Sequence, residues 1–64
     1  MIIEAYNNFQ AEGITIQDKA YNGIVFGEHP AGYTTLDIYV KGELVKWFYI
    51  SNWKAALQTY KNIF

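Results

Sequence analysis

The sequence contains no cysteine and no arginine, and each absence excludes a class of site. Without cysteine, neither a disulfide scaffold nor a zinc site built on thiolates can form. Without arginine, the side chain most often used for bidentate contacts to phosphates and bases is missing. No segment approaches the roughly 18 uninterrupted apolar residues of a membrane helix, and residues Met1 to Glu4 lack the basic region of a signal peptide. We therefore expect a cytoplasmic protein that does not bind membranes.

What the sequence does contain is apolar and aromatic. Its 64 residues are 52% hydrophobic and 19% aromatic, with a formal net charge of −1. This composition excludes a disordered chain and predicts one small domain over residues 1–64. One core of this size rarely supplies more than about 3–5 kcal/mol, so we expect aromatic-rich packing, self-association into a homodimer, or both. A domain this small can rarely spare the walls of a deep pocket, and we expect neither an enzyme nor a cofactor.

Two glycine-containing dipeptides predict β-hairpins. Asn22-Gly23 is the strongest short hairpin signal, because a type I′ turn needs positive φ at both central residues. It predicts strands at about residues 14–21 and 24–29. Lys41-Gly42 predicts a second hairpin between residues 34–40 and 43–50.

The register of the second hairpin decides which side chains share a face. A two-residue loop pairs Val40 with Glu43 and Leu36 with Trp47, and sets Asp37 opposite Lys46. One face then carries Leu36, Ile38, Val40, Val45, Trp47 and Tyr49. A three-residue loop with a glycine bulge is the alternative, and it would exchange the buried face. The sequence leaves this choice open, although we prefer the two-residue loop.

Both ends of the chain have helical patterns. Towards the carboxyl end, one helical face collects Trp53, Ala56, Leu57, Tyr60 and Phe64, and Ser51 or Asn52 is the expected cap. At the amino end, Ile2, Ala5, Tyr6 and Phe9 share a helical face that Gly13 can end. An edge strand over residues 1–6 is the alternative, but its alternation is poor. We predict an α+β fold, in which an antiparallel sheet of three or four strands, made of two hairpins, packs against a C-terminal helix, with a short N-terminal helix.

Few residues point to catalysis or to a metal. The sequence has one histidine, His29, and one serine, Ser51, whose place at the helix start indicates a structural role. His29 precedes Pro30 in a turn and is expected to be a loop residue rather than a general base. Glu28, His29 and Asp37 do not have the spacing of a known metal site.

The aromatic residues instead favour binding to a protein. One short helix cannot cover both faces of the sheet, and exposed tyrosines and tryptophans are typical of interfaces. We expect the partner surface on the face that carries Tyr21, Phe26, Tyr39, Lys46 and Phe48. The size, the lack of cysteine and the sheet-plus-helix pattern resemble small phage or mobile-element accessory proteins. The resemblance, which no motif carries, implies inhibition of a host or partner protein.

A small single-stranded nucleic-acid-binding protein is the alternative. Aromatic rings on a sheet can stack on bases, and lysines can contact phosphates. The candidate residues are Lys41, Lys46, Trp47 and Tyr49. The negative net charge and the absence of arginine argue against this interpretation.

Overall fold

The computed structural model describes residues 1–64, with the exception of the side chain of Pro30. Helix α1 (Ile2–Ala11) is followed by strands β1 (Gly23–His29), β2 (Tyr33–Val40) and β3 (Glu43–Tyr49), and by helix α2 (Trp53–Ile63). Short 3-10 turns at Pro30–Gly32 and Ile50–Asn52 precede β2 and α2. The strands form one antiparallel sheet in the order β1-β2-β3. The predicted α+β fold is confirmed.

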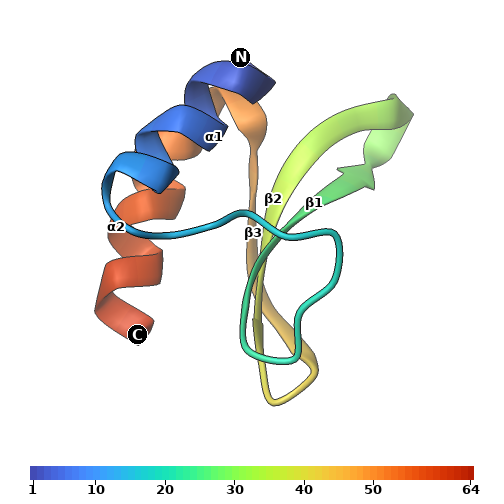
Figure 1. Ribbon diagram of the computed structural model, residues 1–64. Coiled ribbons are helices and arrows are strands. Elements are labelled where there is room, and N and C mark those ends of the chain that lie inside the picture. Colours follow the sequence, from blue (N-terminus) through green and yellow to red (C-terminus); the bar gives the residue numbers. More distant parts are fainter.

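Both helices lie on the same side of the sheet (Figure 1). The two helices run parallel to each other, because the first turn of α2 contacts the first turn of α1 and the last turn of α2 contacts the end of α1. Trp53 Nε1 donates a hydrogen bond of 3.0 Å to Glu4 Oε1. At the other end, Lys61 Nζ lies 2.8 Å from Glu12 Oε1. The opposite face of the sheet is therefore free of helices.

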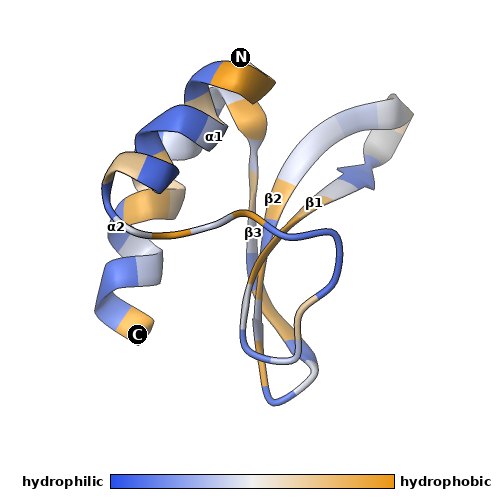
Figure 2. Cartoon of the chain, in the orientation of Figure 1, coloured by the Kyte–Doolittle hydropathy of each residue, from blue (hydrophilic) through white to orange (hydrophobic). Residues whose placement is uncertain are grey.

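The hydrophobic core lies between the two helices and the sheet. Its buried side chains are Ala5, Phe9, Ile16, Ile24, Leu36, Ile38 and Ala56. Cross-strand pairing of Ile24 with Ile38 and of Phe26 with Leu36 places these four residues on the helix-covered face. Figure 2 agrees with this position of the core, because β1 and β2 contain most of their hydrophobic (orange) residues in their lower parts and are white to blue towards the tip of their hairpin.

The strand predicted at residues 14–21 is wrong. Strand β1 begins at Gly23 itself, and its partner is β2 across the turn at Pro30–Gly32. Residue Gln17 forms only an isolated parallel bridge with Val25. Asn22 does not form its own hairpin turn, and its side chain instead accepts a 2.7 Å hydrogen bond from the backbone N–H of Lys41. The longer apolar pairing offered by β2 outweighs the local turn preference.

The two-residue loop of the second hairpin is confirmed, but the register beyond it is wrong. Val40 pairs with Glu43, and both Lys41 (φ 52°) and Gly42 (φ 82°) have the positive φ of a type I′ turn. The register then shifts at Ile38/Tyr39, which leaves Val45 as an extra residue in β3.

This β-bulge moves every later residue of β3 to the other face. Leu36 consequently pairs with Phe48, and Asp37 pairs with Trp47, in place of the predicted pairs with Trp47 and Lys46. Phe48 packs against the core, while Trp47 and Tyr49 lie on the helix-free face.

The predicted helices are confirmed at both ends of the chain. In α1, Ala5 and Phe9 are buried, whereas Tyr6 is exposed, and Gly13 follows with φ 79°. In α2, Ala56 is buried, and Trp53, Leu57 and Tyr60 pack against the core. Phe64, predicted on the same face, is exposed.

Asn52, one of the two predicted caps, occupies the cap position of α2, but it makes no side-chain hydrogen bond there. Ser51, the other candidate, lies in the preceding 3-10 turn. Within the described residues, neither helix has the length and apolar character needed to cross a bilayer.

Candidate functional site

The helix-free face of the sheet contains a buried carboxylate. Asp37, in the central strand β2, is 4% exposed. Its Oδ1 accepts a 2.8 Å hydrogen bond from the hydroxyl of the fully buried Thr35. Its Oδ2 lies 3.1 Å from Nε2 of His29, within hydrogen-bond distance. Asp37 is therefore held from two sides.

The carboxylate fits only because residue 27 is a glycine. Gly27 lies in β1 opposite Thr35, next to the pair formed by Val25 and Asp37. A Cβ atom at Gly27 would collide with the carboxylate of Asp37 and would lie 2.8 Å from the Thr35 hydroxyl. The absent side chain creates the space that the Asp37 carboxylate occupies.

Four aromatic side chains from three strands form a continuous row above this carboxylate. His29 of β1 stacks on Trp47 of β3, with ring centroids 4.8 Å apart and planes at 12°. Trp47 meets Tyr49 edge to face at 5.1 Å, and Tyr49 meets Tyr33 of β2 in the same way at 5.8 Å. We call these four residues the aromatic ladder. Edge-to-face and offset stacking are the preferred arrangements of aromatic rings, so the ladder is mutually supporting.

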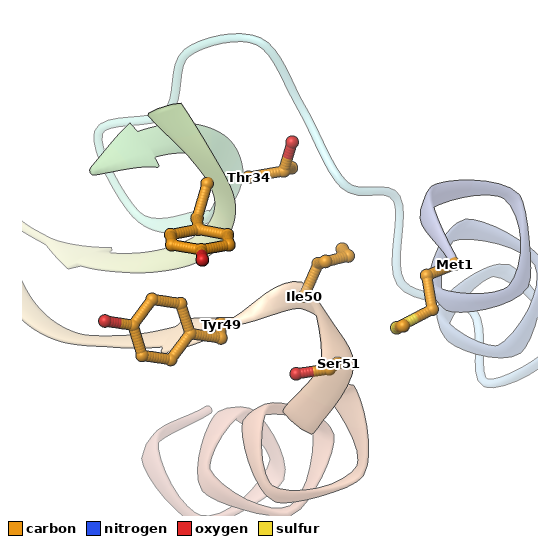
Figure 3. Close-up of a pocket in the computed structure, with 6 residues that line it drawn as sticks. Met1, Thr34, Tyr49, Ile50 and Ser51 are labelled. Carbon is orange, nitrogen blue, oxygen red and sulfur yellow. The ribbon is translucent and has the colours of Figure 1, made fainter. Parts of the chain in front are cut away.

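The exposed end of the ladder borders an open cavity. The cavity has a volume of about 520 Å³ and is lined by Met1, Tyr33, Thr34, Tyr49, Ile50 and Ser51. Met1 precedes α1, Tyr33 and Thr34 belong to β2, Tyr49 ends β3, and Ile50 and Ser51 belong to the following 3-10 turn. Figure 3 shows these residues around one open space. We call it the tyrosine pocket. Tyr33 is 61% exposed and Tyr49 is 44% exposed, so their rings are accessible to a ligand.

The residues predicted to form one partner surface do not lie on one face. Phe26 and Phe48 pack against the core under the helices. Lys46 pairs with Ile38 on this same side, with its ammonium 5.7 Å from the Phe48 ring centroid. Tyr39 lies on the helix-free face, and Tyr21 is exposed in the connection before β1. The prediction of a single surface is wrong. The β-bulge turns Phe48 and Lys46 to the helix side of the sheet, and the pairing of β1 with β2 places Phe26 on that side as well. A binding role for each residue stays a prediction.

The nucleic-acid candidates are divided in the same way. Trp47 and Tyr49 are neighbours in the aromatic ladder. Lys41, however, lies in the β2–β3 turn, and Lys46 lies on the helix side of the sheet. The structure therefore separates the aromatic rings from the predicted phosphate contacts.

The sequence interpretation missed His29, Asp37 and Tyr33. His29 was placed at the end of the predicted strand 24–29 and was expected to act only as a turn residue, but it is half-buried at the end of β1 and contacts Asp37 and Trp47. Alternation from Val25 through Gly27 to His29 is the signal that could have placed it on the same face as Asp37. Among the described residues, no cluster of His, Cys, Asp and Glu side chains could hold a metal ion.

Comparison with known proteins finds no relative, since no family model, no curated protein and no solved structure matches this chain.

Proposed function

We propose that this protein is a non-enzymatic protein-interaction module that binds its partner with the tyrosine pocket and the exposed end of the aromatic ladder. The observation that carries the proposal is the contact between Tyr33 and Tyr49, which are exposed yet packed edge to face beside an apolar cavity. Aromatic side chains are enriched at the energetic centres of interfaces, where a large apolar area is combined with a polar tip.

The ladder supports binding because its rings are held in place before a partner arrives. Tyr49 is packed against Trp47, and Trp47 is stacked on His29, whose imidazole is hydrogen bonded to Asp37. Ordering a mobile side chain at an interface costs roughly 0.5–1.5 kcal/mol, and a ring that is already fixed avoids much of this cost.

His29 has a positioning role in this proposal rather than a catalytic one. Its ring is fixed by the Asp37 carboxylate and by the stacked Trp47. The stacked rings of His29 and Trp47 thereby link β1 to β3 across the central strand β2. A cytoplasmic setting, favoured by the cysteine-free composition, and inhibition of the partner belong to the same proposal.

The test compares capture by three forms of the immobilised protein. The wild type and Tyr6→Ala, which removes an exposed tyrosine outside the tyrosine pocket, are expected to retain the same protein from a lysate of the source cell. The double variant Tyr33→Ala/Tyr49→Ala should lose that protein while remaining folded. Adding the wild-type chain to the captured protein, if that is an enzyme, then tests inhibition.

Two results would contradict the proposal. The first is a captured protein that all three forms retain equally. The second is retention of nucleic acid that is released steeply by salt, which would instead favour the single-stranded nucleic-acid alternative. Self-association into a homodimer remains a separate prediction, and sedimentation of the purified chain at increasing concentrations tests it.

A further inference from the structure

We propose that two copies of this chain pair through the free edge of β3, so that their sheets join into one continuous antiparallel sheet. The contact is made by residues 43–46, and all four of them are exposed in the single chain. Their side chains are acidic, apolar, apolar and basic in order. A segment of this kind is complementary to a second copy of itself that runs in the opposite direction.

The outer edge of β3 is open to a second copy. In the part of the chain that the structure describes, β3 pairs only with β2. Glu43 closes the two-residue turn with Val40, so the next residue, Leu44, directs its backbone N–H and C=O away from β2. These groups are available to a further strand, and the addition of a strand to an exposed edge is a recurring mode of association.

The other edge of the sheet, at β1, is already occupied by the segment that precedes this strand. The backbone N–H of Gln17 donates a 2.9 Å hydrogen bond to the carbonyl of Ile24, and the carbonyl of Gln17 accepts a 3.2 Å hydrogen bond from the N–H of Phe26. Gln17 thereby uses the backbone groups in the middle of the β1 edge. A second copy consequently finds the longer free edge at β3.

The β-bulge allows the charges of this segment to meet those of a second copy. Residues three apart in a regular strand point to opposite faces of the sheet. Here, however, Glu43 pairs with Val40 and Lys46 pairs with Ile38, and these two partners share a face because they are two residues apart. The extra residue Val45 therefore places the carboxylate and the ammonium on the same face. A two-fold axis can then set each Glu43 opposite Lys46 of the other copy.

The same register brings the two apolar residues together. Leu44 of one copy lies opposite Val45 of the other, and these side chains are 42% and 47% exposed in the single chain. Burial of their apolar area favours association, and an opposite-charge pair flanks it on each side. A lysine on an edge strand usually discourages pairing, but here each lysine has a carboxylate opposite it. A register centred on Lys46 would instead set two ammonium groups against each other.

Pairing over residues 43–46 leaves the tyrosine pocket open. Tyr49 lies three residues beyond the paired segment. At about 3.3 Å per residue, the two Tyr49 residues of the dimer lie roughly 30 Å apart along the strand direction. If the tyrosine pocket binds a partner as proposed, the dimer offers two such sites at its opposite ends. Because the paired segment is short, we expect a weak dimer with a dissociation constant of about 10–100 µM.

Charge exchange tests the pairing directly, with sedimentation of the purified chain at increasing concentrations as the measurement. Glu43→Lys and Lys46→Glu, each alone, set like charges opposite each other at both contacts, so each should weaken self-association about tenfold or more. A mixture of the two variants restores opposite charges at both contacts and should form a heterodimer about as tight as the wild-type dimer. The double variant Glu43→Lys/Lys46→Glu should dimerise for the same reason.

Two variants at exposed positions away from this edge are the matched controls. Glu28→Lys in β1 and Lys54→Glu in the first turn of α2 change the net charge by the same amounts, and both should dimerise like the wild type. Raising the wild-type concentration should shift the backbone amide resonances of Leu44 and Val45 and leave that of Tyr33 in place. An amide spectrum of each variant in dilute solution verifies that it is folded.

Three results would overturn the inference. The first is a wild-type chain that stays monomeric at the highest concentration. The second is a dimer that Glu43→Lys and Lys46→Glu leave as tight as before, which would place the contact elsewhere. The third is a mixture of these variants that associates no better than either alone. None of these results affects the proposed function, which depends on Tyr33 and Tyr49.

Discussion

Asp37 shows how single residues shape the helix-free face. Burial of a carboxylate is costly unless hydrogen bonds replace the lost water. Here Thr35 and His29 provide these bonds, and Gly27 provides the space. His29 in turn reaches the stacking position on Trp47 while it is hydrogen bonded to Asp37. The polar pair and the aromatic ladder therefore depend on each other.

Removal of the carboxylate should destabilise the fold. In Asp37→Ala, the buried Thr35 hydroxyl loses its acceptor and His29 loses its partner, so we expect a loss of about 1–3 kcal/mol in the free energy of unfolding. Urea denaturation measures the loss. Glu43→Ala removes an exposed carboxylate from the same sheet and should change stability by less than about 0.5 kcal/mol. Equal stability of the two variants would refute the structural role of Asp37.

A methyl group at residue 27 tests the close approach of the carboxylate. Gly27→Ala should cost about 1–3 kcal/mol, because the added atom overlaps the Asp37 carboxylate and the strand must shift. The same substitution made in the Asp37→Ala background should cost much less, since the clashing group is gone. Additive costs in this double-mutant cycle would show that the two residues do not touch.

At the scale of elements, α1 is required although it contributes no residue to the aromatic ladder. It contributes Phe9, which is completely buried beside Ile24 and Leu36 in the core cluster. It also contributes Glu4 and Glu12, which contact α2 at both ends. The first helix consequently fixes α2 against the sheet, and its first turn borders the tyrosine pocket.

On helix α1, Phe9→Ala should lower the free energy of unfolding more than Tyr6→Ala does. Phe9→Ala should cost about 3–5 kcal/mol, which is comparable to the whole stability of a domain this small. Tyr6→Ala, one turn earlier at an exposed position, should cost far less. Thermal unfolding followed by circular dichroism compares them, and similar melting temperatures would contradict the assignment of Phe9 to the core.

The elements that the sequence predicted correctly have strong local patterns. The helical spacing in residues 53–63 and in residues 2–11 reflects one buried face in each case, so periodicity alone identified both helices. The Lys41-Gly42 turn was also correct. In contrast, Asn22-Gly23 has an equally strong local signal, but its pairing depends on which distant strand competes for β1.

The candidate site could not be predicted because it depends on a one-residue shift. The extra residue Val45 determines whether Trp47 or Phe48 faces the helices, and no local feature of β3 identifies it. Once the faces are exchanged, the stacking of His29 on Trp47 and the burial of Asp37 follow. The expectation of exposed aromatic residues on the sheet agrees with Tyr33 and Tyr49, whereas the residues predicted to form one partner surface lie on different faces.

For the whole molecule, the two sides of the sheet have different roles. The helix side contains the hydrophobic core, and the helix-free side contains the polar pair and the aromatic ladder. The tyrosine pocket lies at the end of the sheet, where Tyr33 and Tyr49 meet the starts of the two helices. Each side has one tryptophan, because Trp47 lies in the ladder and Trp53 lies between the helices with its indole bonded to Glu4. The two indole N–H groups are therefore internal reporters of the two sides.

The most direct test records these two indole resonances in a nitrogen–proton spectrum while the captured partner is added. The account predicts that the Trp47 signal shifts or broadens in a saturable manner, because Trp47 contacts Tyr49 at the edge of the tyrosine pocket. The backbone amide of Lys41, in the turn at the opposite end of β2 and β3 from Tyr33 and Tyr49, should stay in place and serve as the control. A partner that shifts Trp53 and leaves Trp47 unchanged would place the binding surface on the helix side and contradict the account.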